Sequence, residues 1–521
     1  MNCVREAAAI ESRRSSSRVL ACRTLAGFTV AVLSILHAHS LPAQQGAKPP
    51  AGPKAQQSSS GNQRPGAGAQ LRTEAADGLS ADARLLNLLA DHRYRSIEAQ
   101  LDSLPPEQAQ FYRGILANRS NDLAESIQLL EPLVDRVAES SNTAREKLLR
   151  KALAEDYLRL GEWAKAADAY QALDARLNGK LSADEQDEIE MPLKLLPLVR
   201  DNSPTTVEPC EPFKLQVSED PLGLIDIPVF VDVHPRNWML DPTLPFDLIS
   251  LSTAKAAGLK ISTASATVST LTGRPIQIRA TVIPHFAIGG RLTLHDMTAF
   301  VYDDKDYFFP DTSYQVEGVL GYPALAAIGG LTVTSDNTIF VRPAKQLAPP
   351  EEDDRLTTGA RFYLDGDQVI VALGRAGNAA GDPSRQPGPG PPGKGIAGAG
   401  AAGNSAGAAE DERMFAIDAG GQQTYLTSRY FDEHAAQFNG QKTEMFSYLG
   451  PESPPQPAYL AESVPLQVGE TSVTLHYIHV LTQPAGSAHD DVYGVLGTDA
   501  LGQLKSYTFD YRTMRFAVTV E

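Results

Sequence analysis

The sequence predicts a multidomain protein in which a short all-α segment precedes a mainly β unit of two lobes. The chain has 521 residues, more than one hydrophobic core usually accommodates. Apolar residues recur three and four apart over residues 81–200, and after Pro204 they alternate with polar residues in short runs. The β-rich part also presents one order of events twice, which indicates an internal duplication.

The composition is that of a folded acidic protein. Hydrophobic residues make up 42% of the chain and charged residues 21%, and the formal net charge is −17. Nucleic-acid binding requires concentrated Lys and Arg, so we expect no nucleic-acid partner. The ten histidines show no paired spacing, and no Gly-rich loop joins a strand to a helix. We therefore expect neither a metal site nor a cofactor.

The N-terminus has the layout of a secretory signal peptide over residues 1–43. Arg13, Arg14, Arg18 and Arg23 precede the apolar run from Leu25 to Leu36, and small or turn-forming residues follow it. The run is shorter than the roughly 20 residues of a membrane-spanning helix, so a retained membrane anchor is the weaker alternative. We expect a secreted or periplasmic protein in which residues 44–80 form a disordered linker. Signal cleavage would leave Cys210 as a single, inert thiol.

Residues 81–200 contain two stretches with the spacing of paired helices, in which small residues allow close approach and aromatic residues fill the seam. The clearer stretch includes Tyr157, Gly161 and Trp163, and the looser one includes Tyr112 and Asn121. Both resemble tetratricopeptide repeats, although their separation exceeds the usual period of 34 residues. Such helices either present a concave surface to a protein partner or only brace the neighbouring lobe.

The duplicated part places an aspartate at the end of an apolar strand in each copy. Asp241 follows the first strand and Asp418 the second, and a Gly-Val-Leu-Gly run begins 77 residues after Asp241 and 76 after Asp418. This order resembles the retropepsin-like aspartyl proteases, which have an apolar strand, Asp-Thr-Gly-Ala-Ser, a helix, a flap hairpin and a closing Leu-Gly loop. The resemblance implies one retropepsin-like lobe at 212–345 and another at 359–521, with a disordered insertion at 378–410.

In that family each lobe supplies one aspartate to a shared catalytic pair, so the resemblance implies Asp241 and Asp418 as the catalytic residues. Close like charges cannot both ionise, so one carboxyl polarises the scissile carbonyl and the other deprotonates a water. The resemblance further implies substrate contacts at Gly420 in the second loop and at Thr272 and Gly273 in a flap. A second flap is expected at 446–457.

Both loops depart from the family motif. The second loop, Asp418-Ala419-Gly420, keeps the acid and the glycine but lacks the hydroxyl. The first loop reads Asp241-Pro242-Thr243, in which proline lacks an N–H and threonine replaces the flexible glycine. We expect this change to disturb the geometry around Asp241. Asp247, which aligns with Thr424, is interpreted as a helix-start residue and not as a substitute acid.

Three functions stay open on the sequence alone. The first is an acid endopeptidase that acts on extended peptides in a cleft between the lobes, and the second is an inactive peptide-binding or scaffolding protein with the same fold. The third is a protein whose helical segment docks a partner. The departures at Pro242 and Thr243 favour the second function, and the duplicated aspartates favour the first.

Overall fold

The structure is a computed structural model, and it describes most of the chain after residue 79. The described residues are 80–140, 142–269, 274–310, 312–347, 354–366, 368–375, 412–418, 423–448, 455–484 and 490–520. The predicted signal peptide, the predicted linker apart from Ser80 and the predicted insertion at 378–410 lie outside the described residues.

An N-terminal helical part precedes a mainly β part, as the sequence predicted. The helical part consists of α2 (Ala81–Ala90), α3 (Tyr94–Glu98), α4 (Pro106–Arg119), α5 (Leu123–Leu130), α6 (Val134–Glu139), α7 (Thr143–Arg159), α8 (Trp163–Leu177) and α9 (Ala183–Leu195). Short 3₁₀ turns lie at Leu101–Ser103, Glu131–Leu133 and Leu196–Leu198. The tetratricopeptide identity of these helices stays a prediction.

Local sequence signals set the ends of these helices. The turn between α4 and α5 contains Asn121 with φ of 59°, and the turn between α7 and α8 contains Gly161 with φ of 67°. Asn and Gly are the residues that adopt this left-handed conformation at least cost. At the start of α9, the Ser182 hydroxyl accepts from the Glu185 N–H and the Glu185 carboxylate accepts from the Ser182 N–H. Such a capping box satisfies helix donors that otherwise lack a partner.

The first half of the β part closes into a ring of paired strands. The order around the ring is β8, β9, β6, β12, β5, β4 and back to β8. The strands are β4 (Ile225–Val231), β5 (His234–Leu240), β6 (Leu248–Ser250), β8 (Pro275–Ile288), β9 (Leu292–Tyr302) and β12 (Gly318–Leu320). The ring also carries β1 (Thr206–Val207), β3 (Ser218–Glu219), β7 (Ala266–Ser269), α10 (Leu251–Ala256) and α11 (Tyr322–Ile328), and β10 (Phe308–Phe309) pairs separately with β11 (Tyr314–Gln315).

The second half closes into a ring with the same connectivity. The order is β20, β21, β18, β22, β17, β16 and back to β20. The strands are β16 (Gln368–Arg375), β17 (Arg413–Ile417), β18 (Tyr425–Leu426), β20 (Gln456–Val468), β21 (Thr471–Leu481) and β22 (Gly494–Leu496). This ring carries β19 (Glu444–Phe446), α14 (Ser428–His434) and α15 (Thr498–Leu501). In both rings the strand that precedes the aspartate runs parallel to the Gly-Val-Leu strand.

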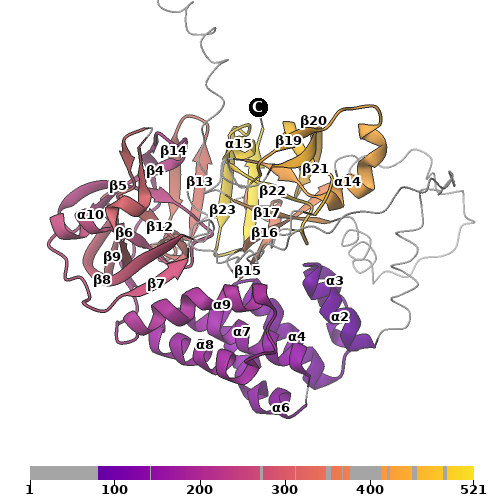
Figure 1. The fold of residues 1–521 in the computed structure, drawn as a ribbon, viewed down its shortest axis with the longest axis horizontal. Coiled ribbons are helices and arrows are strands. Elements are labelled where there is room, and N and C mark those ends of the chain that lie inside the picture. The colour runs from indigo at the N-terminus through magenta and orange to yellow at the C-terminus, as the bar shows by residue number, and fades with distance from the viewer. Residues whose placement is uncertain are drawn as a thin grey trace, which may run out of the picture.

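An antiparallel run of strands extends from the second ring, where β15 pairs with β16, and takes in strands from both halves of the β part. Its order is β15 (Ala360–Asp365), β24 (Arg515–Thr519), β23 (Ser506–Asp510), β13 (Gly330–Thr334), β14 (Thr338–Arg342) and β2 (Phe213–Gln216). The short helix α12 (Asp354–Thr357) precedes β15. At the centre of the sheet Thr332 pairs with Thr508, and their buried hydroxyl oxygens are 2.9 Å apart. The two halves thus share one continuous hydrophobic core. Figure 1 shows the halves side by side with the helical part along one side of both.

The glycine that opens each Gly-Val-Leu-Gly run is required by close packing. A Cβ on Gly318 would lie 2.3 Å from the Trp238 ring, and a Cβ on Gly494 would lie 2.7 Å from the Leu426 side chain. Real Cβ atoms do not approach heavy atoms so closely, so the repeated motif reflects the same steric constraint in both rings.

A buried ionic cluster docks the helical part onto the hairpin between β15 and β16. Arg119 at the end of α4 is 4% exposed, and its Nη2 lies 2.8 Å from Oδ1 of Asp365. The Tyr94 hydroxyl donates to Oδ2 of Asp365 at 2.9 Å. His92 Nδ1 lies 3.3 Å from that same oxygen, and His92 Nε2 lies 2.8 Å from Oδ2 of Asp491. Ionic contacts from two helices therefore converge on one hairpin tip.

The electrostatics of this cluster follow from burial and pairing. Burial opposes ionisation of Asp365, but the Arg119 charge and the His92 hydrogen bond outweigh it and hold the pKa of Asp365 well below its usual value. Burial also opposes the charged form of His92 and so acts to lower its pKa. The hydrogen bonds of His92 to Asp365 and Asp491 outweigh this effect and raise the pKa of His92 to about 9. Both groups are therefore charged near neutral pH, where each neutralises the other.

Removing the central carboxylate should destabilise the protein. Asp365→Asn leaves Arg119 and His92 buried without their main counter-charge, so we expect a loss of about 3–5 kcal/mol in unfolding free energy. The measurement is urea or thermal unfolding at pH 6. Asp168→Asn is the matched control, because Asp168 pairs with Arg200 on the open surface and that pair contributes little. Equal stability of the two variants would contradict a stabilising role for the cluster.

The same cluster predicts how stability changes with pH. His92 binds its proton more tightly in the folded state, with a pKa of about 9 against 6.5 for free histidine, so its contribution is complete below pH 6.5 and disappears towards pH 9. We expect a loss of about 3 kcal/mol across this range. The Asp365 contribution is instead lost as pH falls below 3.8. His92→Gln should flatten the alkaline arm of the unfolding profile, and His476→Gln, on an exposed strand position, should not.

Candidate functional site

The first candidate acid lies at the end of β5, beside the strand that closes its ring. β12 runs parallel to β5 and pairs Leu320 with Leu240, and the Asp241 N–H donates to the Leu320 carbonyl at 3.0 Å. These contacts fix the backbone of Asp241 against the Gly-Val-Leu strand. Asp241 is completely buried.

The second candidate acid occupies the equivalent position in the other ring. β22 runs parallel to β17 and pairs Leu496 with Ile417, and the Asp418 N–H donates to the Leu496 carbonyl at 2.9 Å. Asp418 is partly exposed. Gly420, expected to contact substrate, lies outside the described residues. Each aspartate thus follows an equivalent strand, lies beside an equivalent parallel strand and makes the same backbone hydrogen bond.

Thr243 holds the Asp241 carboxylate through two hydrogen bonds. The Thr243 N–H donates to Oδ1 of Asp241 at 2.9 Å, and the Thr243 hydroxyl donates to the same oxygen at 2.6 Å. Thr243 does not adopt a positive φ. An ordinary backbone conformation brings both donors of Thr243 to the Asp241 carboxylate. Pro242 lies between the two residues, where no N–H is required for either bond.

Tyrosine side chains lie near both acids. Burial raises the pKa of Tyr307, and the nearby carboxylates of Asp306 and Asp241 raise it further. Burial also raises the pKa of Tyr511, and the nearby Tyr322 and Asp241 raise this pKa further. Tyr511 belongs to the second half of the β part, so Asp241 lies close to the junction of the two halves.

Asp418 also has a tyrosine neighbour. Burial raises the pKa of Tyr425 well above its usual value, and the charge of Asp418 raises it further. Tyr425 opens β18, the strand that follows the Asp418 loop. A tyrosine that stays neutral beside a carboxylate can serve as a hydrogen-bond donor.

Asp247 corrects a sequence interpretation. It does not start a helix, because Ser250 is the residue that caps α10. Instead its Oδ1 accepts from the Gly321 N–H at 2.8 Å, and burial raises the pKa of Asp247 to about 8. The residue is a buried structural acid that anchors the Gly-Val-Leu-Gly run of the first ring.

The second ring makes the same anchor with a hydroxyl. The Gly497 N–H donates to the Thr424 hydroxyl at 2.8 Å, so Thr424 does occupy the position of Asp247. The Thr424 N–H in turn donates to Oδ2 of Asp499 at 3.1 Å. Both rings therefore use an acid at this point. Asp247 binds the glycine N–H directly in the first ring, and Asp499 of α15 holds Thr424 in the second. The supporting role of Asp499 was not predicted from the sequence, although its place in the run Gly-Val-Leu-Gly-Thr-Asp offered a signal.

The structure describes the strands on either side of both predicted flaps. Thr272 and Gly273 fall between β7 and β8 but lie outside the described residues. In the second ring β19 pairs with β20 antiparallel as far as Phe446 and Gln456, and residues 449–454 of that hairpin lie outside them as well. The strands that flank both expected flaps are therefore in place.

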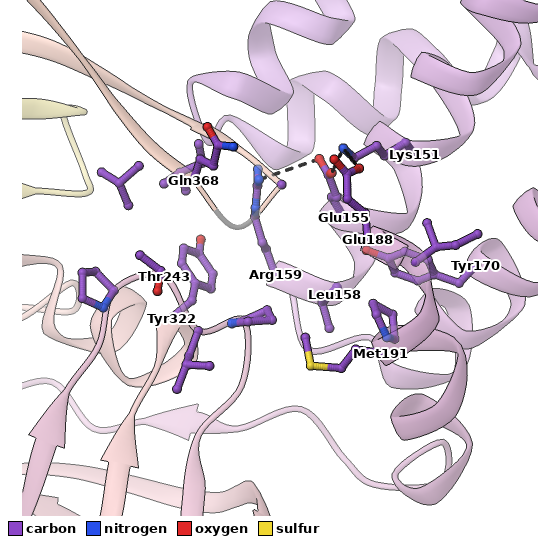
Figure 2. Close-up of a pocket in the computed structure, with 18 residues that line it drawn as sticks. Lys151, Glu155, Leu158, Arg159, Tyr170, Glu188, Met191, Thr243, Tyr322 and Gln368 are labelled. Carbon is purple, nitrogen blue, oxygen red and sulfur yellow. Dashed lines mark hydrogen bonds and ion pairs between the residues drawn. The ribbon is translucent and has the colours of Figure 1, made fainter. Parts of the chain in front are cut away.

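A cavity lies between the Asp241 loop and the helical part. The cavity is partly open to solvent, and its walls come from α7, α8, α9, the loop 242–245, Tyr322 and the β15–β16 hairpin. Figure 2 shows Arg159 of α7 with Gln368, Thr243 and Tyr322 on one side of its side chain. The helical part thus contributes directly to the surroundings of the first acid.

Other kinds of site receive no support from the described residues. No group of three or more His, Cys, Asp or Glu side chains there could hold a metal ion. Within the same ranges no helix is long and apolar enough to cross a membrane. Cys210 is a free, partly exposed thiol whose Sγ lies 3.2 Å from the Glu211 carbonyl.

Residues 227–324, from β4 into α11, match the aspartyl protease family model. Among solved structures, conglutin gamma, a basic 7S globulin from lupine seeds, is 12% identical over 60% of this chain and 95% of its own, with a TM-score of 0.34. Basic 7S globulin from soybean is 12% identical over 60% and 96%, with a TM-score of 0.33. A retropepsin-like aspartic protease from Rickettsia conorii is 16% identical over 25% and 98%, with a TM-score of 0.19. No curated protein sequence is significantly similar. The predicted resemblance to aspartyl proteases is confirmed for the segment that contains Asp241.

Substitution of Asp247 tests whether a hydroxyl can replace the carboxylate as the acceptor for the Gly321 N–H. Asp247→Thr copies the second ring and keeps an acceptor for the Gly321 N–H, so we expect stability within about 1 kcal/mol of the parent. Asp247→Val leaves that buried N–H without an acceptor and should cost about 1–3 kcal/mol. Urea unfolding at pH 6 gives both values. A valine variant as stable as the threonine variant would show that the hydrogen bond is unimportant.

Proposed function

We propose that the protein is an aspartic endopeptidase that uses Asp241 and Asp418 as its acid pair. The observation that carries this proposal is the equivalent placement of the two residues. Each follows the strand parallel to a Gly-Val-Leu strand, and each donates its N–H to the carbonyl of the leucine in that strand. The match of residues 227–324 to the aspartyl protease family supports the same assignment for the first acid.

In the proposed mechanism the two carboxyls share one proton. The ionised member removes a proton from a water that attacks the scissile carbonyl, and the protonated member donates a hydrogen bond to the carbonyl oxygen. Thr243 orients the Asp241 carboxylate through two hydrogen bonds to Oδ1. Because the chemistry needs one protonated carboxyl, hydrolysis should be faster at acid pH than at neutral pH.

Peptide binding without turnover is the second candidate function. Asp241 is completely buried, and the loop that follows it forms one wall of a cavity that α7 and α9 cover. This enclosure favours a ligand that enters the cavity over an extended substrate that crosses an open cleft. Peptide binding that persists in a protein with no detectable hydrolysis would favour this candidate.

We further propose export by the predicted signal peptide at 1–43 and a tether formed by 44–80. The helical part is proposed to brace the β part. The ion pairs of Arg119 with Asp365 and of Arg361 with Glu98 support bracing, since they turn helix side chains towards the β part. Docking of a protein partner on the opposite face is the alternative role of these helices.

The peptidase proposal predicts the effect of two neutral substitutions. Asp241→Asn and Asp418→Asn should each reduce hydrolysis of a mixed peptide library at pH 4 by about a thousandfold or more, because each removes one member of the pair. Asp296→Asn is the control, since Asp296 is exposed on β9 and its positive φ suits asparagine. Mass spectrometry of the products gives the rates. Full activity in Asp418→Asn would remove the proposal.

A further inference from the structure

The cavity between the helical part and the Asp241 loop combines an apolar lining with one incompletely paired cation. The space between its walls and at its open mouth together comes to about 750 Å³. The lining residues that offer apolar surface come from helices and loop alike: Leu158, Tyr170, Ile189, Met191, Leu244 and Pro245. Pockets of this kind fix a ligand with a few polar groups, and the arrangement of those groups defines its class.

Arg159 is the polar group that distinguishes this cavity. Its side chain is only 6% exposed, and Nη1 donates to the Asn118 carbonyl at 2.9 Å. Nη2 is buried and donates no hydrogen bond to any residue that the structure describes. The carboxylate beside it is that of Glu155, whose Oε2 lies 3.8 Å away, beyond hydrogen-bond distance.

The acids near Arg159 are engaged by other cations. Oε2 of Glu155 accepts from Arg119 at 3.1 Å, and Glu188 pairs with Lys151. In Figure 2 Glu155, Glu188 and Lys151 gather on one side of Arg159, and Thr243, Tyr322 and Gln368 lie on the other. The guanidinium therefore borders space that its acidic neighbours do not fill.

A buried guanidinium with an unsatisfied N–H is costly, and a planar carboxylate is the acceptor that matches its geometry. The two acids in the lining limit the charge that the cavity tolerates, because they would repel a phosphate with two negative charges more strongly than a carboxylate with one. The apolar walls at Leu158, Met191 and Leu244 suit hydrocarbon next to that carboxylate.

We propose that this cavity binds the C-terminal end of a peptide, with the chain carboxylate on Arg159 and the last apolar side chains against Leu158, Met191 and Leu244. A chain end needs only one entrance, whereas an internal segment needs an entrance and an exit. Helices α7 and α9 on one side and the loop 242–245 on the other leave the ligand between them. The site therefore recognises a free carboxyl end.

This inference goes beyond the proposed peptidase, because binding at Arg159 requires no chemistry at Asp241 or Asp418. Binding is expected to persist in Asp418→Asn. A protein without any hydrolytic activity therefore still tests the inference, and a failure of binding leaves the peptidase proposal open.

The experiment compares three peptides that share one dye-labelled sequence, Ala-Ala-Leu-Phe, measured on the Asp418→Asn protein by fluorescence anisotropy. One has a free C-terminal carboxylate, one is amidated, and one is amidated after an added aspartate. We expect the free acid to bind at least about tenfold more tightly than the amide, since a charged hydrogen bond is lost with the amide. Equal affinity for acid and amide, or for the aspartate peptide and the free acid, would overturn the inference.

Two variants locate the site. Arg159→Gln should bring the ratio of acid to amide affinity close to one, and Arg200→Gln should preserve it, because Arg200 pairs with Asp168 on the surface away from the cavity. A ratio unchanged in Arg159→Gln would place binding elsewhere. If Arg159→Gln does not fold, Met191→Trp decides the question. That variant fills the cavity and should weaken binding of the free acid at least tenfold, and unchanged binding would contradict the proposal.

Discussion

The burial of the Asp365 carboxylate is the constraint on which the arrangement of the helical and β parts depends. A carboxylate taken out of water needs cations and donors within reach, and here Arg119, His92 and Tyr94 supply them from the helical part. Arg119 belongs to α4, Tyr94 is the first residue of α3, and His92 lies in the turn before α3. The helices therefore cannot move away from the β15–β16 hairpin without leaving buried charges unpaired. That requirement holds α7 and α9 over the Asp241 loop and creates the cavity beside it.

The two rings show how one architecture accepts different residues at equivalent positions. Both rings need an acceptor for the N–H of the glycine that ends the Gly-Val-Leu-Gly run, and they provide it with the Asp247 carboxylate in one and the Thr424 hydroxyl in the other. Thr243 likewise provides two donors to Asp241 despite the altered motif. The backbone geometry sets the hydrogen bonds, and several side chains can complete them.

The surroundings of the first acid connect the two proposals made for this protein. Asp241 is held at the junction of the two halves of the β part, close to Tyr511 of the second half, and the loop that follows it borders the cavity. A protein in which both proposals hold would have a binding pocket for a free carboxyl end beside its acid pair. A site that retains only the pocket would bind such ends without cleaving them. Both outcomes use the same enclosed geometry.

Local pattern alone was enough to predict a helical part before a β part, and the repeated order of strand, aspartate and Gly-Val-Leu-Gly run. Hydrophobic periodicity, turn residues and steric demands such as that of Gly318 against Trp238 act over short distances, so the sequence determines them directly. Contacts between distant segments were decided only in the tertiary structure. The pairing of Arg119 with Asp365, the role of Asp247 and the position of Arg159 in the wall of a cavity depend on which surfaces meet, because a charged side chain gives no sign in sequence of the partner that will bury it.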